Sequence, residues 1–170
     1  MKLTLTSGSQ RGLTLVELIV AGTIFTVIAL SSAILFASVL KLGARSKLVE
    51  EIQREGDAAV AGMSRNLRDG VSLDTANSVL TGNPQALQIK LSNNQTRKYY
   101  VTGGQLHYIN ESGVDQNLLL PGTTVTSLTF TPASDTIGLQ VISAQLTLSR
   151  TKAGQTQSLS FGSTINTRPQ

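Results

Sequence analysis

The hydrophobic pattern of the chain begins with a long apolar run, residues 18–40, which contains no charged residue. A helix crosses a bilayer with roughly 20 consecutive apolar residues, so this run predicts one transmembrane helix. Glu17 lies immediately before the run. A carboxylate at the edge of a span is costly and indicates a function, unless the headgroup region simply solvates it. The pattern alone leaves both interpretations of Glu17 open.

A second apolar pattern, with the spacing of an amphipathic helix, occupies residues 43–69. Its apolar side chains recur four or seven positions apart, and Val49 and Val60 widen the same face. The recurring side chains are Leu48, Ile52, Ala59, Met63 and Leu67. No proline interrupts residues 13–83. We therefore expect one continuous helix from residue 13 to about residue 69, about 85 Å long at 1.5 Å per residue.

Glycines mark the weak points and the end of this predicted helix. Gly43, Gly56 and Gly62 each lower helix stability by about 1 kcal/mol, so these are the positions at which a bend or local melting would occur in the continuous helix. Gly70 follows the amphipathic pattern and fits a helix C-cap.

Beyond residue 70 the chain changes to the two-residue alternation of β-strands. Residues 71–84 have the composition of a loop. The alternating runs that predict strands are 85–91, 97–102, 105–109, 123–131, 139–149 and 156–166. Gly103 and Gly104 separate two of these runs, which is a signal for a two-residue hairpin. Five or six short strands predict one antiparallel sheet, and the amphipathic helix can cover its apolar face. The expected fold class is α+β.

Composition narrows the function classes. The chain has 170 residues, of which 4% are aromatic and 14% charged, with no tryptophan and no cysteine. The core must therefore be aliphatic, and disulfides and cysteine-ligated metals are excluded. The sequence pI is about 9.7 and the formal net charge is +4, which falls to +2 without Lys2 and Arg11. No charge run is dense enough to predict a nucleic-acid patch.

The N-terminus has the basic-then-apolar order of an export signal, and three interpretations compete. The first is a secretory signal peptide cut after the apolar run, where Ser31, Ser32 and Ala33 mimic a cleavage site. Against it, the apolar run is longer than the ~7–15 residues of such a signal. The second is an uncleaved single-pass anchor. The third is a leader cut before the run, which would leave the span in the mature protein.

The charges that flank the span do not select among these interpretations. Lys2 and Arg11 precede it, whereas Lys41, Arg45 and Lys47 follow it. The positive-inside rule is nearly balanced, and it leans against export of the C-terminal part.

The segment RG-LTLVEL resembles the class III signal of type IV pilins and type II secretion pseudopilins. That family has a short basic leader ending in glycine, an apolar first mature residue, glutamate at mature position five, and a long apolar helix. Gly12 matches the residue before the cut, Leu13 the first mature residue, and Glu17 the fifth. Leu13 departs mildly from the pattern, because phenylalanine is commoner there. The motif covers about ten residues and is specific, because all its parts must agree.

The resemblance implies a processing pathway. A prepilin peptidase would cut between Gly12 and Leu13 at the cytoplasmic face, and Leu13 would be N-methylated. The carboxylate of Glu17 would neutralise a terminal ammonium, usually on a neighbouring subunit. Electrostatics agrees with this role, because a carboxylate that enters an apolar filament core needs an ionic partner. The implied partners are other pilin or pseudopilin subunits, the prepilin peptidase and the pilus assembly platform.

The resemblance also implies a domain plan. It consists of a leader (1–12), a transmembrane and filament-core helix (13–42), an amphipathic helix (43–70) and an antiparallel β domain (71–170). The protein would sit in the inner membrane with its C-terminal domain outside the cytoplasm, and would move into a surface pilus or periplasmic pseudopilus. The segments YYVTGGQLHY and LSFGSTINTR resemble W-type minor pilins and J-type pseudopilins. The cysteine-free β domain with few aromatics favours a minor subunit.

Candidates for catalysis or metal binding are few. His107 is the only histidine and lies on an alternating run, which favours a histidine with a structural partner. Glu111 and Asp115 flank a turn, but they lack the density of oxygen ligands that calcium sites use. No nucleophile has a plausible set of partners, so we expect neither an enzyme nor a cofactor.

The three tyrosines of the chain lie on the two runs that flank the predicted hairpin. Tyr99, Tyr100 and Tyr108 are expected near one another across a hairpin, where aromatic side chains usually pack. DNA stacking by these rings is a remote alternative, relevant only to a DNA-uptake pilus.

The main alternative function is a single-pass anchored binding module with no filament role. Residue types alone do not separate adhesion, motility, DNA uptake and secretion.

Overall fold

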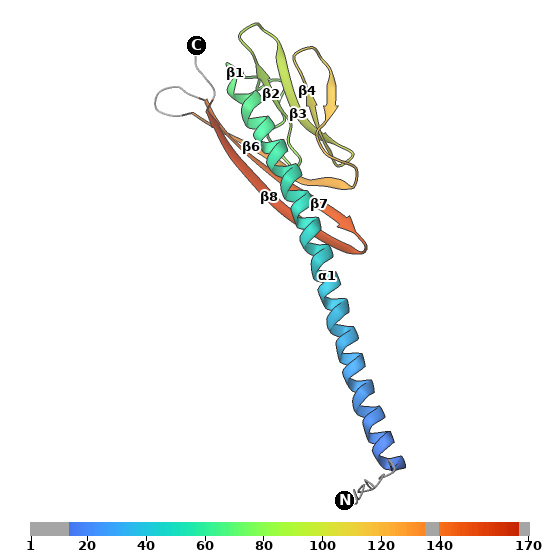
Figure 1. The fold of residues 1–170 in the computed structure, drawn as a ribbon. Coiled ribbons are helices and arrows are strands. Elements are labelled where there is room, and N and C mark those ends of the chain that lie inside the picture. Colours follow the sequence, from blue (N-terminus) through green and yellow to red (C-terminus); the bar gives the residue numbers. More distant parts are fainter. Residues whose placement is uncertain (1–13, 135–139, 167–170) are drawn as a thin grey trace, which may run out of the picture. The chain divides into compact units, whose positions relative to one another are not determined.

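The computed structural model describes residues 14–134 and 140–166, and the chain divides into two units, Met1–Gly43 and Ala44–Gln170. The predicted cleavage and methylation positions, Gly12 and Leu13, lie outside the described residues. A single helix, α1 (Leu15–Arg68), continues through the boundary between the units (Figure 1). The prediction of one continuous helix is confirmed, and Gly43 does not interrupt it.

The part of α1 in the second unit buries the predicted face. Leu48, Ile52, Ala59, Met63 and Leu67 are all buried, as the spacing predicts. The seven-residue gap in that pattern is occupied by Gly56, which is buried as well. A side chain at this position would overlap the ring of Phe161. Gly56 therefore serves a close contact between the helix and a strand, which helix propensity alone did not indicate.

The strands form two antiparallel sheets, so the expectation of a single sheet is wrong. The strands of the first sheet, in spatial order, are β1 (Ser72–Leu73), β2 (Leu87–Lys90), β3 (Thr96–Thr102), β4 (Gln105–Ile109) and β5 (Asp115–Asn117). The strands of the second sheet, in spatial order, are β6 (Thr123–Ser134), β7 (Gln140–Lys152) and β8 (Gln155–Asn166). Alternation identifies most of these strands but carries no information on which strands pair.

Two short elements escaped the sequence pattern. The predicted loop 71–84 contains β1 and an isolated bridge between Val79 and Ala86. The stretch that begins at Asp115 forms β5, which has no apolar residue. Both strands are too short or too polar for a two-residue period to be visible.

Two backbone hydrogen bonds join strand β6 of the second sheet to segments that flank strands of the first sheet. The amide of Val125 donates to the carbonyl of Gly104 at 2.8 Å, and the amide of Gln85 donates to the carbonyl of Leu128 at 2.8 Å. The Gly103–Gly104 turn is the predicted two-residue hairpin, with φ angles of 57° and 75°. Strand β6 is therefore joined to the first sheet by backbone hydrogen bonds to the Gly103–Gly104 turn and to the loop before β2.

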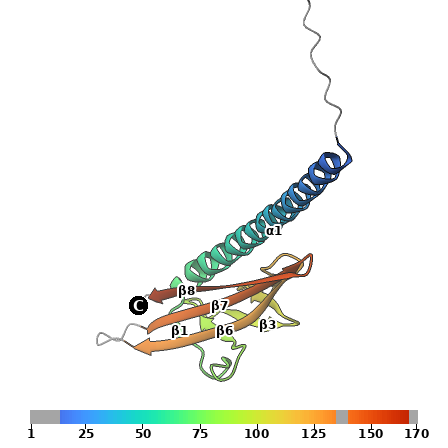
Figure 2. The same cartoon turned by 90° about the horizontal axis from the view of Figure 1, so that it is seen from below.

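The core lies between these sheets and the second part of α1. One face of β7 is buried, at Ile142, Ala144, Leu146 and Leu148, which fits the predicted alternation of residues 139–149. Figures 1 and 2 show this part of α1 alongside β8, in agreement with a 2.7 Å hydrogen bond between the hydroxyls of Ser64 and Ser163.

Gly70 follows the end of α1 but does not form a left-handed cap, because its φ lies outside that region. A Cβ atom there would lie 2.9 Å from Cδ1 of Ile89. The position therefore needs glycine for close packing of the helix end against β2 and not for the capping conformation.

Candidate functional site

The first candidate site is the apolar part of α1, in the first unit. By length and composition this helix can cross a membrane, and none of its most apolar window is buried within the structure. Large apolar side chains cover all sides of it; Leu15, Phe25, Ile34 and Leu42 are each at least 65% exposed. A helix that is apolar all round requires either lipid or other helices around it. The predicted transmembrane segment is consistent with this arrangement.

The hydroxyl groups within the apolar run are satisfied inside the helix itself. Thr23 donates to the carbonyl of Val20, and Thr26 donates to the carbonyl of Gly22, both at 2.8 Å. Ser31, Ser32 and Ser38 make the same kind of bond to the carbonyl four residues earlier. These polar residues therefore expose no unpaired donor to an apolar medium, where each would cost several kcal/mol.

Glu17 lies in the first turn of α1, where its carboxylate is exposed. Its backbone amide donates to Oγ1 of Thr14 at 3.3 Å, and the amide of Leu18 donates to the Thr14 carbonyl at 3.2 Å. Thr14 thus caps the helix, and the Thr-x-x-Glu spacing is that of a capping box. A negative charge in this turn also favours the helix dipole. The three-residue spacing of Thr14 and Glu17 carries this signal in the sequence, although the sequence pattern predicts that the helix begins at residue 13.

Within the second unit, an ion cluster joins the residues of α1 after Gly43 to strand β7. One guanidinium nitrogen of Arg150 lies 2.7 Å from Glu55, and Nε lies 3.6 Å from Glu51. Lys152 reaches Glu51 at 3.4 Å, and Arg150 also donates to the hydroxyl of Thr123 at 3.2 Å. The second carboxylate oxygens of Glu51 and Glu55 are buried without a hydrogen-bond partner. The four-residue spacing of the glutamates shows that they share a helix face, but the sequence gives no sign of Arg150 as their partner.

A second ionic contact fixes the C-terminal end of α1. The guanidinium of Arg97 donates to the carbonyl of Asn66 at 2.9 Å and lies 3.0 Å from Glu111 and 3.5 Å from Asp69. The pKa of Glu111 lies below its ordinary value because a backbone amide and Arg97 both donate to the carboxylate. The carboxylate of Glu111, one of the two acids considered for calcium, is therefore paired with Arg97.

Asp115, the other acid considered for calcium, has different partners. It accepts hydrogen bonds from the hydroxyl of Tyr100 at 2.7 Å and pairs with Nδ1 of His107 at 3.0 Å. The bond from Tyr100 is the main reason that the pKa of Asp115 is lowered. Within residues 14–134 and 140–166 no group of three or more histidine, aspartate or glutamate side chains is placed to hold a metal. The prediction that His107 has a structural partner is confirmed.

The three tyrosines divide between the two faces of the first sheet. Tyr99 and Tyr108 are buried and stacked, with ring centroids 4.8 Å apart. Asn66 donates to the hydroxyl of Tyr99 at 2.8 Å, and burial raises the pKa of that hydroxyl. Tyr100 lies on the opposite face beside His107. The predicted packing role is confirmed for Tyr99 and Tyr108.

Comparisons of the chain with protein-family models, with curated proteins and with solved structures found no match.

Proposed function

We propose that this protein is a structural subunit, of the minor kind, of a type IV pilus or type II secretion pseudopilus. A prepilin peptidase removes residues 1–12, and the apolar part of α1 holds the subunit in the inner membrane until assembly. The same helix surface then packs into the filament core, while the second unit makes contacts between neighbouring subunits.

One observation carries the proposal. A single helix of 54 residues has an apolar surface that none of the described residues covers, and its continuation is the buried helix of a β-rich unit. Glu17 is the only charge in residues 13–40 and stands in the first turn. Association in lipid or in a filament core can use the exposed apolar side chains, whereas a carboxylate in that environment requires a cation. The amine released by cleavage before Leu13 would supply that cation.

The N-terminal mass of the protein recovered from its native membrane tests the proposal. We expect methylated Leu13 as the first residue. A variant with Gly12 replaced by glutamate should keep the full leader, because the peptidase must recognise the residue at the cut. A wild-type protein that retains Met1, or one cut after residue 30, would contradict the proposal and favour an anchored or secreted binding module.

The second measurement is the amount of processed subunit recovered in the filament fraction. The processed subunit should appear in sheared pili or in overproduced pseudopili, and the Gly12→Glu variant should stay in the membrane fraction. Correct processing without any recovery in filaments would contradict the assembly role but not the membrane anchoring.

A further inference from the structure

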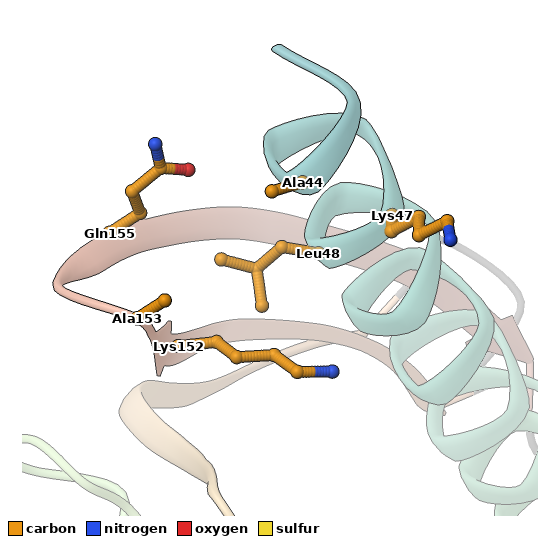
Figure 3. Close-up of a pocket in the computed structure, with 6 residues that line it drawn as sticks. All are labelled: Ala44, Lys47, Leu48, Lys152, Ala153 and Gln155. Atoms are coloured by element: carbon orange, nitrogen blue, oxygen red, sulfur yellow. The ribbon is translucent and has the colours of Figure 1, made fainter. Parts of the chain in front are cut away.

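A small apolar pocket lies between the start of the buried part of α1 and the turn from β7 to β8 (Figure 3). Its volume is about 180 Å³. It is lined by Ala44, Lys47, Leu48, Lys152, Ala153 and Gln155. In Figure 3, Leu48 points from the helix towards the β7–β8 turn, and the apolar stem of Lys152 runs beneath it. The pocket therefore has a mainly apolar lining. The ammonium group of Lys47 is directed away from Leu48 and the turn in Figure 3, and the ammonium group of Lys152 lies 3.4 Å from Glu51.

The charges around this pocket are predominantly positive. The nearby acids already have partners, because Glu50 pairs with Arg54 and Glu51 pairs with Arg150 and Lys152. Arg45 and Lys47 are exposed, and neither pairs with a carboxylate of the described residues. These two side chains leave an excess of positive charge that no carboxylate in the described part of the second unit neutralises.

The turn itself contains a strained residue. Ala153 has a φ of 51°, in the left-handed region that glycine tolerates and alanine does not favour. It is exposed, and it places a methyl group on the lining of the pocket. Ala153 and Gly154 both have positive φ angles, as the two central residues of a type I′ hairpin turn require. The turn therefore places an apolar group next to Lys152 at an exposed hairpin tip.

We propose that Arg45 and Lys47, which follow the apolar part of α1, bind the headgroups of anionic phospholipids, with the adjacent pocket and turn providing an apolar surface beside them. Both residues follow the apolar part of α1 within one or two helical turns, which is headgroup level for a spanning helix. A polybasic segment next to a span gains affinity from anionic lipid. This role accounts for the basic residues that contradict the positive-inside rule. It requires the span but not assembly into a filament.

A site-specific label tests the proposal on the full chain. The protein has no cysteine, so a single Thr156→Cys substitution beside the turn accepts one fluorophore. The labelled protein is reconstituted in phosphatidylcholine vesicles with or without phosphatidylglycerol, and quenching by a headgroup nitroxide lipid is measured. We expect stronger quenching in the vesicles that contain phosphatidylglycerol.

A label at Val114→Cys provides the positional control. Val114 is exposed and lies in the same turn as Glu111. Arg97 donates hydrogen bonds both to Glu111 and to the carbonyl of Asn66, so this turn lies near the C-terminal end of α1. That end of the helix is about 22 Å from Glu51 at 1.5 Å per residue. Quenching at this position should not respond to phosphatidylglycerol.

Charge variants decide whether the effect belongs to this site. Replacing both Arg45 and Lys47 by glutamine should lower the ratio of docked to undocked unit about five-fold per charge. Replacing Arg65 and Arg68, two exposed arginines of the last helical turn, removes the same charge and should leave quenching unchanged. Equal quenching in the two lipids, or an equal loss in both double variants, would overturn the proposal. Neither result would affect processing before Leu13, which is measured separately by mass.

Discussion

The ring of Phe161 packs directly over Gly56, at a position of α1 where any side chain would overlap it. The contact joins the middle of the buried helix face to β8, and it explains why glycine stands where the helix period calls for a larger apolar residue. Alanine in its place would improve helix propensity by about 1 kcal/mol but would force the ring to move. Close packing therefore outweighs propensity at this residue.

This relationship makes a prediction about two glycines of one helix. Gly56→Ala should lower the free energy of unfolding by about 1–2 kcal/mol, because overpacking costs more than helix propensity returns. Gly62→Ala should raise it by about 0.5–1 kcal/mol, because no atom lies within 4 Å of a Cβ there. Urea unfolding of the full chain in detergent measures both. Stabilisation by both substitutions would contradict the packing argument.

The strained turn makes a second prediction. Ala153→Gly should raise the free energy of unfolding by about 0.5 kcal/mol, because relief of the left-handed strain exceeds the entropy that glycine adds to the unfolded chain. Ala58→Gly, on an exposed and unstrained turn of α1, should lower it by about 1 kcal/mol. Thermal melting of the three proteins gives the comparison, and a loss of stability in Ala153→Gly would show that its φ carries no strain. If the turn provides an apolar surface beside the bound headgroups, the same variant should dock less well although it folds better.

The ion cluster on β7 makes a third prediction. Arg150→Gln should destabilise the second unit by about 3 kcal/mol, because Glu55, whose side chain is 9% exposed, would remain without its cation. The double variant Arg150→Gln, Glu55→Gln should recover much of that loss, since no buried charge is left unpaired. A double-mutant cycle by chemical unfolding measures the coupling. Additive effects of the two single substitutions would show that the pair contributes nothing.

Acid should weaken the segment around β1 and β2. Asp74 is buried, and the pKa of its carboxyl is lowered, chiefly because Asn77 donates to it, with Lys90 adding a favourable charge. A folded pKa below the unfolded value means that Asp74 stabilises the fold above pH 4 or so and that this contribution disappears as the pH falls further. Asp74→Asn should therefore reduce the fall in melting temperature between pH 6 and pH 3. An unchanged pH dependence would contradict this assignment.

The role of Glu17 makes the fifth prediction. Glu17→Gln keeps the shape of the side chain and the helix cap formed by Thr14, but it removes the charge. Cleavage of the leader should therefore continue, whereas recovery of the subunit in filaments should fall at least ten-fold. Glu50→Gln, which removes an exposed charge further along α1, should assemble normally. Immunoblots of membrane and filament fractions measure both. Normal assembly of Glu17→Gln would show that the residue serves only the helix start.

The sequence by itself determined the elements whose physics is local. The period of Leu48, Ile52 and the later members of that set defined the buried face of α1 before any partner was known, because a helix period depends only on the spacing of apolar residues. The same holds for the buried alternation of β7 and for the Gly103–Gly104 turn. The sequence also places Glu17 at the start of the apolar helix, although it leaves the role of the carboxylate open.

Only the tertiary structure decided the relations between distant residues. The contact of Gly56 with Phe161, the pairing of Glu55 with Arg150 and the division of the strands into two sheets all join segments far apart in the chain. Side-chain periodicity specifies which face an element buries but not which neighbour covers it. The pocket beside Lys47 and Lys152 belongs to the same class, because its two walls come from α1 and from the β7–β8 turn.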